Sequence, residues 1–200
     1  MKHTIDLVDS GKGRKKVLVG HDWGAFNSYN FDKKYPGYLS EMMTLDVGLG
    51  FDSSILGSLY ILAYQMFLTL AFLIWRPIGD LMTKLFVKLI SGKNYTPKNA
   101  SSINASYNYF YFYLWKGIFL SLIGRKPRIL AQYKKSCPLV YVYASDKPMM
   151  FHSQKFLLNL SKEEGNEMYA VKGGHWIMNR NEGLLVDILK RRIGKLENKN

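Results

Sequence analysis

The sequence predicts an α/β fold with a mostly parallel sheet that is interrupted by a helical insertion. A strand, a helix and a second strand follow one another in residues 17–47, and the same alternation returns after an uncharged stretch. Strands that are joined through a helix usually pair in parallel, so the two outer parts are expected to share one sheet. We therefore divide the chain into residues 1–50, 51–135 and 136–200.

The first part begins with a short apolar run. Residues 17–19 end at Gly20 and predict a buried strand. Residues 25–35 predict a helix, which Pro36 ends. A second apolar run at residues 42–47 predicts the next strand, which completes a strand-helix-strand unit.

The middle of the chain has a different character. Residues 53–75 contain no Asp, Glu, Lys, Arg or His, and this length meets the usual criterion for a membrane-spanning helix. Polar residues of this run fall within a narrow stripe of a helical wheel, which is typical of a mostly buried helix with one polar edge. They are Ser54, Ser58, Gln65 and Thr69. Both interpretations stay open, because hydropathy alone does not separate a buried helix from a span.

Three further segments complete the insertion. Residues 80–91 carry charges at four-residue spacing and predict an amphipathic surface helix. Residues 91–108 are rich in Ser, Asn, Thr and Lys and predict a loop. The aromatic cluster that follows, which ends before Gly117, is expected to belong to a core.

After residue 138 the alternation of strands and helices returns. Strands are predicted at residues 139–144 and 167–171, and helices at residues 151–160 and 182–193. The last helix is expected to turn one apolar face inward. That face consists of Leu185, Ile188 and Leu189.

The most specific motif is Gly-His-Asp-Trp-Gly-Ala at residues 20–25, between the first predicted strand and helix. Its glycines, two positions either side of Asp22, have the spacing of a nucleophile elbow. Such a turn strains the central residue and crowds its neighbours, so both glycines are expected to be required. A central carboxylate suits displacement at the sp³ carbon of an epoxide or alkyl halide, which forms an alkyl ester on the protein. A histidine is then needed to activate water against that ester.

This motif resembles the elbow of epoxide hydrolases and haloalkane dehalogenases, a branch of the α/β-hydrolases in which it commonly reads GHDWG. A second motif, Gly-Gly-His-Trp at residues 173–176, follows the last predicted strand, where that family carries its catalytic histidine. The resemblance implies a partial α/β-hydrolase fold with a helical cap insertion. It also implies that Asp22 is the nucleophile, that His175 activates water, and that no metal or cofactor takes part.

The resemblance leaves the acid that orients His175 open between two residues. Asp146 follows the strand at residues 139–144, but it stands one position earlier than the family's Gly-x-x-Asp-Pro pattern would place it, and Lys147 fills that position. Asp46 lies at the end of the strand after the elbow helix, which is the other location that the family uses. The two residues are equal candidates at this point.

Further roles follow from the same resemblance. In epoxide hydrolases, cap tyrosines donate hydrogen bonds to the opening epoxide oxygen, and Tyr109, Tyr111 and Tyr113, with Tyr107, are the matching donors here. The backbone N–H of Trp23, the residue after the nucleophile, would serve the oxyanion hole. In dehalogenases the tryptophan at this position helps to bind halide, so that activity is an alternative. The apolar insertion favours a hydrophobic small-molecule substrate.

The family has additional strands and a His-Gly-type loop before the elbow, and that loop supplies a second oxyanion donor. Only residues 1–16 precede the first predicted strand here, so we expect the chain to be truncated relative to the family fold. Three explanations stay open. The chain is a fragment of an active hydrolase, a catalytically impaired hydrolase that acts as a structural or membrane-associated subunit, or a chain whose missing strands come from a partner.

Composition narrows the partners and the location. With 28 Lys and Arg against 15 Asp and Glu, the net charge of +13 favours anionic partners. The basic residues form short separate groups without a zinc signature or an RNA-binding aromatic motif, so no nucleic-acid binding is expected. A membrane or protein partner would bind through the apolar residues 53–75. The single Cys137 and the absence of a signal peptide predict an intracellular protein, either cytoplasmic or membrane-associated.

Overall fold

The computed structural model describes residues 1–52, 55–91, 102–125, 133–147 and 149–198. The chain divides into two compact units. Unit 1 combines Met1–Asp52 with Gln132–Asn200, and unit 2 is Ser53–Ala131.

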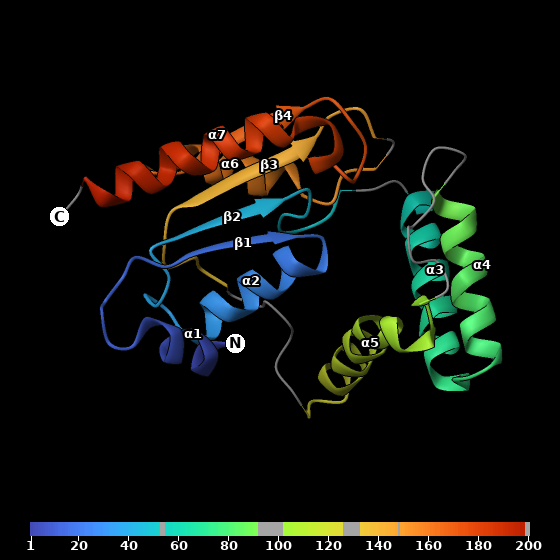
Figure 1. Cartoon of the computed structure of the whole chain (residues 1–200). Helices are drawn as coiled ribbons and strands as arrows, with labels where there is room; N and C mark the ends of the chain where they lie inside the picture. Colours follow the sequence, from blue (N-terminus) through green and yellow to red (C-terminus); the bar gives the residue numbers. More distant parts are fainter. Residues whose placement is uncertain (53–54, 92–101, 126–132, 148, 199–200) are drawn as a thin grey trace. The chain divides into compact units, whose positions relative to one another are not determined.

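Unit 1 is built on a parallel sheet whose described strands have the order β1-β2-β3-β4 (Figure 1). The strands are β1 (Val17–His21), β2 (Glu41–Leu45), β3 (Leu139–Ala144) and β4 (Glu167–Val171). The helices of this unit are α1 (Lys2–Asp9), α2 (Trp23–Lys34), α6 (Gln154–Lys162) and α7 (Met178–Glu197). The strands that precede and follow unit 2 in the sequence belong to one sheet, because β2 pairs with β3. The prediction of an α/β fold with a parallel sheet is therefore confirmed.

The two faces of the sheet have different partners, because successive strand residues point to opposite faces. One face forms a hydrophobic cluster with α7 and the loop before it. Its buried members are Met43, Leu45, Val140, Val142, Ala144, Val171, Ile177, Leu185 and Ile188. On the other face, the hydroxyl of Tyr29 in α2 lies 2.8 Å from that of Thr44, and Tyr141 contacts the ring of Phe156 in α6. Unit 1 is thus a three-layer arrangement, with α7 on one face and α2 and α6 on the other.

The carboxyl ends of the parallel strands meet at one edge of the sheet (Figure 1). Asp22 directly follows β1, and Asp46 directly follows β2. Lys147 comes shortly after β3, and His175 shortly after β4. Residues that are far apart in the sequence are therefore brought together where a parallel sheet usually carries its functional site.

An ion-pair network holds α7 at the opposite end of the sheet. Arg192 is 7% exposed, and its Nε donates to Oε1 of Glu41, the first residue of β2, at 2.8 Å. Its Nη1 donates to Oε1 of Glu167, the first residue of β4, at 2.9 Å. The carbonyl of Gly165 accepts a further hydrogen bond at 2.9 Å. The network fixes the position of α7 along the sheet.

Unit 2 is helical in the residues that the structure describes. Its elements are α3 (Ile55–Ile74), α4 (Ile78–Ser91), the 3₁₀ helix η2 (Ala105–Asn108) and α5 (Tyr109–Leu122). Ring contacts join α3 to its neighbours, between Tyr64 and Phe86 of α4 and between Phe72 and Phe112 of α5. The amide of Asn108 donates to the buried hydroxyl of Thr83 at 2.7 Å, which ties η2 to α4.

Burial in unit 2 differs from what the sequence predicts. Of the two interpretations of this segment, the mostly buried helix does not fit α3, since 17% of its 18-residue apolar window is buried. By length and composition this helix could cross a membrane. The aromatic cluster in α5 is not a closed core either, because Tyr109 is 42% and Tyr113 is 58% exposed. The predicted loop at 91–108 lies largely outside the described residues, and its last four residues form η2.

Candidate active site

Asp22 occupies the tight turn between β1 and α2. Its backbone angles are φ 53° and ψ −120°, a conformation that is strained for a residue with a side chain. Its N–H donates to the carbonyl of Leu45 at 3.4 Å, and its own carbonyl accepts from the N–H of Phe26 at 3.2 Å. The carboxylate is 41% exposed. The turn therefore has the geometry of a nucleophile elbow and presents Asp22 at the edge of the sheet.

The two glycines that flank Asp22 are not equivalent. A Cβ atom on Gly20 would lie 2.5 Å from the carbonyl oxygen of Gly24 and 2.7 Å from Oγ of Ser28, so no side chain fits there. A Cβ atom on Gly24 would meet nothing within 4 Å. The expectation that both glycines are required is right for Gly20 and wrong for Gly24, because only the strand side of the turn is crowded.

His175 lies between two carboxylates that come from different strand ends. Its Nε2 is 3.6 Å from Oδ2 of Asp22, which is within ion-pair range but longer than a hydrogen bond. Its Nδ1 is 2.6 Å from Oδ2 of Asp46. Gly173, with φ 138°, provides a backbone conformation in this loop that residues with side chains rarely adopt. The structure thus brings Asp22, Asp46 and His175 together, although Asp46 and His175 are 129 positions apart in the sequence.

The surroundings of His175 favour its charged form. Burial lowers the pKa of His175, but the nearby carboxylates of Asp22 and Asp46 outweigh that effect and raise the pKa to about 9. His175 is therefore an imidazolium at neutral pH. A positively charged histidine cannot accept a proton from water until one of these carboxylates loses its charge.

Asp46 is fully buried, and each hydrogen bond that its carboxylate oxygens accept favours the ionised form. Its Oδ1 accepts the backbone N–H of Ala144 at 3.0 Å. Its Oδ2 is shared by Nδ1 of His175 and Nζ of Lys147, each at 2.6 Å. Burial raises the pKa of the Asp46 carboxyl, but the hydrogen bonds from His175 and Lys147 bring the pKa below its usual value. Asp46 is therefore a charged, well-paired acceptor for the imidazole.

Lys147 is a member of this cluster whose role is not part of the sequence prediction. Its side chain is only 6% exposed, and its Nζ lies 4.5 Å from the centre of the Phe151 ring. Burial lowers the pKa of Lys147, and the contact with Asp46 partly opposes this change. In the sequence, Lys147 is notable only for its position, because it stands where the resemblance places a carboxylate.

The other candidate acid has a different environment. Asp146 is exposed, and its carboxylate accepts a hydrogen bond from the hydroxyl of its neighbour Ser145 at 2.9 Å. Asp46, in contrast, contacts the imidazole of His175 directly. In the sequence the two residues are equal candidates, because each follows a strand. In the structure the directions of their side chains distinguish them.

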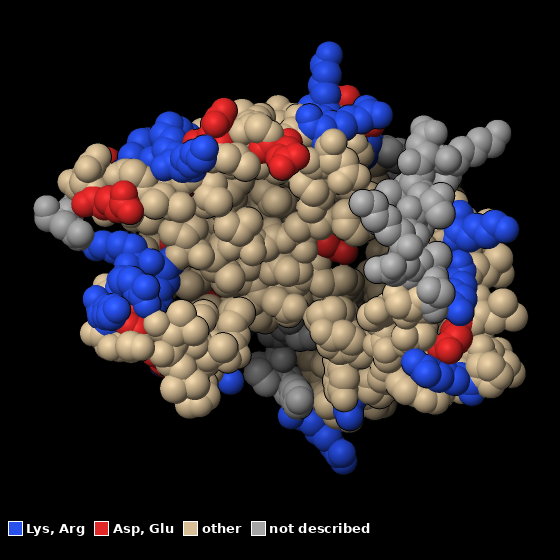
Figure 2. All heavy atoms as spheres, in the orientation of Figure 1, with Lys and Arg blue, Asp and Glu red and all other residues tan. Residues whose placement is uncertain are grey.

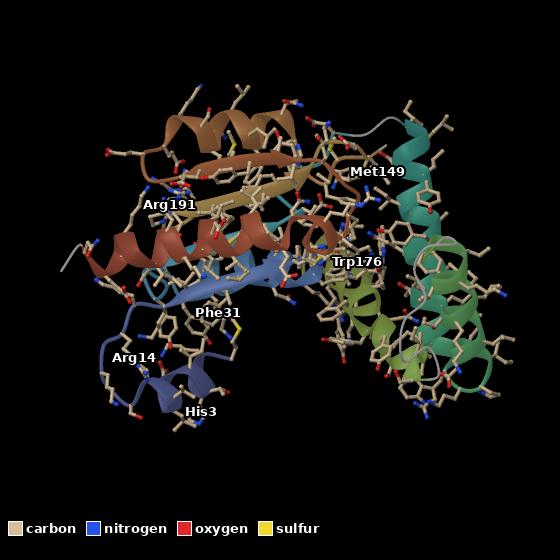
Figure 3. All side chains as sticks on the ribbon, turned by 45° about the horizontal axis from the view of Figure 1, so that its top comes forward. His3, Arg14, Phe31, Met149, Trp176 and Arg191 are labelled. Atoms are coloured by element: carbon tan, nitrogen blue, oxygen red, sulfur yellow. The ribbon has the colours of Figure 1, made fainter. Side chains whose placement is uncertain are left out.

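His21 and Trp176 complete the surroundings of the histidine loop. Nε2 of His21 donates to the backbone carbonyl of His175 at 2.9 Å, and the two imidazole rings are 4.7 Å apart. Burial lowers the pKa of His21, so it supports the loop as a neutral ring. The ring of Trp176 lies 5.1 Å from that of His21. Figure 3 shows Trp176 at the edge of the sheet where the strands end, while Arg191 lies toward the other end.

The remaining predicted site residues divide between the units. Tyr109, Tyr111 and Tyr113 are on α5 of unit 2, where Tyr111 meets Tyr64 edge-on with ring centres 6.0 Å apart. Trp23 is the first residue of α2 in unit 1, directly after Asp22. The hydroxyl groups of Tyr109 and Tyr113 belong to side chains that are 42% and 58% exposed.

A parallel sheet with an acidic elbow after one strand and a histidine loop after the last defines a class of protein. The chain has the α/β-hydrolase fold. No protein-family model and no curated protein matches the sequence.

Solved structures with this fold include epoxide hydrolases and related enzymes. The chain is similar to the epoxide hydrolase of Bacillus megaterium in complex with an inhibitor, with a TM-score of 0.63, 14% identity, and coverage of 96% of this chain and 74% of that one. For the epoxide hydrolase CorEH the TM-score is 0.62 at 14% identity, with 96% and 72% covered. A haloalkane dehalogenase variant from Bradyrhizobium elkanii gives 0.53 at 12% identity, with 98% and 72% covered. At such identities the likeness establishes the fold alone.

Proposed function

We propose that the protein is a hydrolase of the epoxide-hydrolase type, in which Asp22 is the nucleophile and His175 activates water. The observation that carries this proposal is the position of His175, with Nε2 3.6 Å from Asp22 and Nδ1 2.6 Å from Asp46. A carboxylate nucleophile at an elbow suits attack on an sp³ carbon, and a histidine beside it suits hydrolysis of the ester that results.

The first step is ring opening. One oxygen of Asp22 bonds to an epoxide carbon while the bond from that carbon to the epoxide oxygen breaks. The epoxide oxygen takes a proton from a tyrosine hydroxyl, for which we propose Tyr109, Tyr111 or Tyr113. The product of this step is an alkyl ester on Asp22 and a tyrosinate.

The second step is ester hydrolysis. His175 accepts a proton from water, and the hydroxide adds to the carbonyl carbon of the Asp22 ester while the N–H of Trp23 stabilises the oxyanion. The acyl–oxygen bond then breaks, and the departing alcohol oxygen takes the proton from His175. The tyrosinate takes up the proton that the resting imidazolium of His175 loses when it becomes a base, and the new carboxylic acid at Asp22 gives its proton to His175, which restores the resting state.

The charges around His175 support this order of steps. In the resting state Asp22 and Asp46 raise the pKa of His175 to about 9, so the ring is protonated. Esterification removes the charge of Asp22, and the pKa of His175 must then fall. The histidine becomes a base only after the ester exists, which is when a base is needed.

We propose Asp46 as the acid that orients His175, because the two side chains are in contact and Asp46 is fully buried. Asp146 remains the alternative. A hydrophobic epoxide is the proposed substrate class, since the insertion between the two parts of unit 1 is strongly apolar.

The proposal is tested by single-turnover reaction of the full chain with a lipophilic epoxide in ¹⁸O-labelled water. The ester route predicts that the water oxygen enters the carboxylate of Asp22, which mass analysis of the corresponding peptide detects. Asp22→Asn should abolish ester formation and turnover, whereas the matched control Asp187→Asn, at an exposed position of α7, should retain both. Diol formation without label at Asp22 would exclude this mechanism. Absence of any reaction in a folded chain would favour the catalytically impaired, structural alternative.

A haloalkane dehalogenase-like activity is the second candidate. The observation that favours it is Trp23, whose indole directly follows the nucleophile in the position that binds halide in that branch. The same Asp22 ester would form, but halide would be released in place of ring opening. Halide release from 1-bromohexane, compared with diol formation from an epoxide of similar length, distinguishes the two activities.

A further inference from the structure

The exposed side of α3 is a continuous apolar stripe. At about 100° per residue, all of its large exposed apolar side chains except Tyr60 fall within a sector of about 120° that runs the length of the helix. They are Ile55, Leu56, Leu59, Leu62, Met66, Leu70, Leu73 and Ile74. The opposite side contains the buried Leu68 and Ala71. Helix α3 therefore has apolar side chains on its exposed side as well as on its buried side.

Helix α4 repeats this pattern on a shorter scale. Its exposed apolar side chains again lie on one side of the helix. They are Ile78, Leu81, Leu85 and Leu89. Lys84 and Lys88 are exposed and border this stripe on the side away from α3. An apolar stripe with lysines along its border is typical of a helix that lies in a membrane interface.

The two stripes face the same side of the helix pair. After the short connection at residues 75–77, α4 runs back beside α3 (Figure 1). The ring of Phe86 contacts Tyr64 and Phe67, and these residues mark the sides on which the helices meet. On each helix, the apolar stripe lies about 100° around the helix axis from the side that contacts the other helix. Because the two helices run antiparallel, the same rotation brings both stripes to one common face of the pair. We call this surface the α3–α4 face.

The charge of unit 2 is strongly one-sided. Residues 53–131 contain nine Lys and Arg residues and a single acidic residue, Asp80, so this unit carries eight of the 13 net positive charges of the chain. Figure 2 shows a row of Lys and Arg side chains along α4, beside a mostly uncharged surface. This combination of an apolar face and basic flanks is complementary to anionic lipid head groups.

We propose that the α3–α4 face binds an anionic lipid surface, with both helices lying in the plane of the interface. Transmembrane insertion would move Asp80, Lys84 and Lys88 of α4 into hydrocarbon, or would separate α4 from the aromatic contacts that it makes with α3. In-plane binding buries only side chains that are already exposed. It also leaves the lysines free to extend toward the head groups.

Lipid is a better occupant of this face than a second copy of the chain. Two copies would bring two surfaces with the same excess of positive charge together, whereas anionic lipid neutralises that charge. The face is also a smooth aliphatic stripe without acidic groups that could pair with the lysines of a partner copy, because Asp80 is the sole acidic residue of the unit and is paired with Arg76 at 3.5 Å.

The test uses the full 200-residue chain and large unilamellar vesicles in a co-sedimentation assay. Binding is compared between phosphatidylcholine alone and phosphatidylcholine mixed with phosphatidylglycerol. The proposal predicts strong binding to the anionic mixture, weaker binding at high salt, and release of bound protein by alkaline carbonate.

Paired variants separate the apolar and the basic contributions. Leu59→Gln, Met66→Gln and Leu70→Gln together should weaken binding by about tenfold or more. Lys84→Gln and Lys88→Gln should each weaken binding to anionic vesicles by roughly fivefold. The controls change exposed residues of unit 1 in the same way. They are the triple variant of Leu158, Leu184 and Val186 to Gln, and the double variant of Lys155 and Lys190 to Gln.

Each of the other outcomes contradicts the proposal. If folded protein binds neither type of vesicle, the α3–α4 face is not a lipid-binding surface. Protein that resists carbonate extraction has a membrane-spanning helix in place of an in-plane one. A dimer that depends on Leu59, Met66 and Leu70, without vesicle binding, would assign the face to a second copy. Asp22→Asn should bind vesicles like the parent chain, so the result is independent of the proposed catalysis.

Discussion

His175 is placed so that its charge depends on what is bonded to Asp22. Two carboxylates and one ammonium group surround the imidazole, and Asp46 shares one oxygen between His175 and Lys147. Lys147 neutralises part of the charge that Asp46 would otherwise direct at the histidine. We therefore expect the lysine to limit how far the pKa of His175 rises above its ordinary value.

Replacement of this lysine gives a prediction at the scale of single residues. Lys147→Met removes the competing cation from Asp46, so the pKa of His175 should rise above its parent value of about 9. Lys147→Arg retains the charge and should leave the pKa nearly unchanged, while Asp46→Asn should lower it. Titration of the His175 ring nitrogens by NMR measures all three. An unchanged pKa in Lys147→Met would show that the two groups are not coupled through Asp46.

The sequence alone identifies part of this cluster. Asp22 is predictable because the glycines around it have the spacing of a strained turn, and His175 is predictable because its loop resembles the histidine loop of the family. The choice between Asp46 and Asp146 is not predictable, since it depends on which way each side chain points after its strand. Lys147 is visible in the sequence as a departure from a pattern, but its contact with Asp46 requires the fold.

The elbow element gives a second prediction, from two glycines that look alike in the sequence. Gly20→Ala places a methyl group 2.5 Å from the backbone oxygen of Gly24, so it should reduce the free energy of unfolding by about 1–3 kcal/mol. Gly24→Ala enters open space inside α2 and should be neutral or stabilise by up to about 1 kcal/mol. Urea denaturation of both variants tests this. Equal losses would mean that the crowding is not confined to Gly20.

The elements of unit 1 follow well from the sequence, and those of unit 2 follow less well. Strands β2 and β3 are mostly apolar and almost fully buried because parallel strands are covered on both faces, and such segments are easy to recognise. Helix α1 is not predicted, because it has no buried residue and depends on local contacts such as the ion pair between Lys2 and Asp6. For α3, composition predicts the helix correctly, but burial depends on neighbours that the pattern does not specify.

At the scale of the whole molecule, α7 is attached to the sheet through adjacent arginines with different surroundings. Arg192→Met leaves Glu41 as an unpaired buried carboxylate and should reduce the free energy of unfolding by about 3–5 kcal/mol. Arg191 pairs with Glu167 from a side chain that is 41% exposed, so Arg191→Met should cost no more than about 1 kcal/mol. Chemical denaturation compares the two. Similar losses would indicate that the buried network does not hold the helix.

The stability of the whole fold should also depend on pH through His175. Its pKa is about 9 in the folded chain and 6.5 in the reference state, so folding is favoured by the bound proton. This contribution is complete below about pH 6.5 and is lost as the pH rises through about 9. By linkage it amounts to at most about 3 kcal/mol, and to less where solvent screens the exposed carboxylate of Asp22.

The measurement is the free energy of unfolding between pH 6 and about 9.5, a window set by the two pKa values. The parent chain should lose stability across this range, and His175→Gln should have a much flatter profile. His21→Gln is the matched control, because burial lowers the pKa of His21, so any effect of His21 on stability appears as the pH falls and not as it rises through about 9. A parent profile that is flat from pH 6.5 to 9 would mean that His175 is not held as an imidazolium between Asp22 and Asp46. The proposed switch from imidazolium to base on esterification would then lose its physical basis, even if Asp22 still formed an ester.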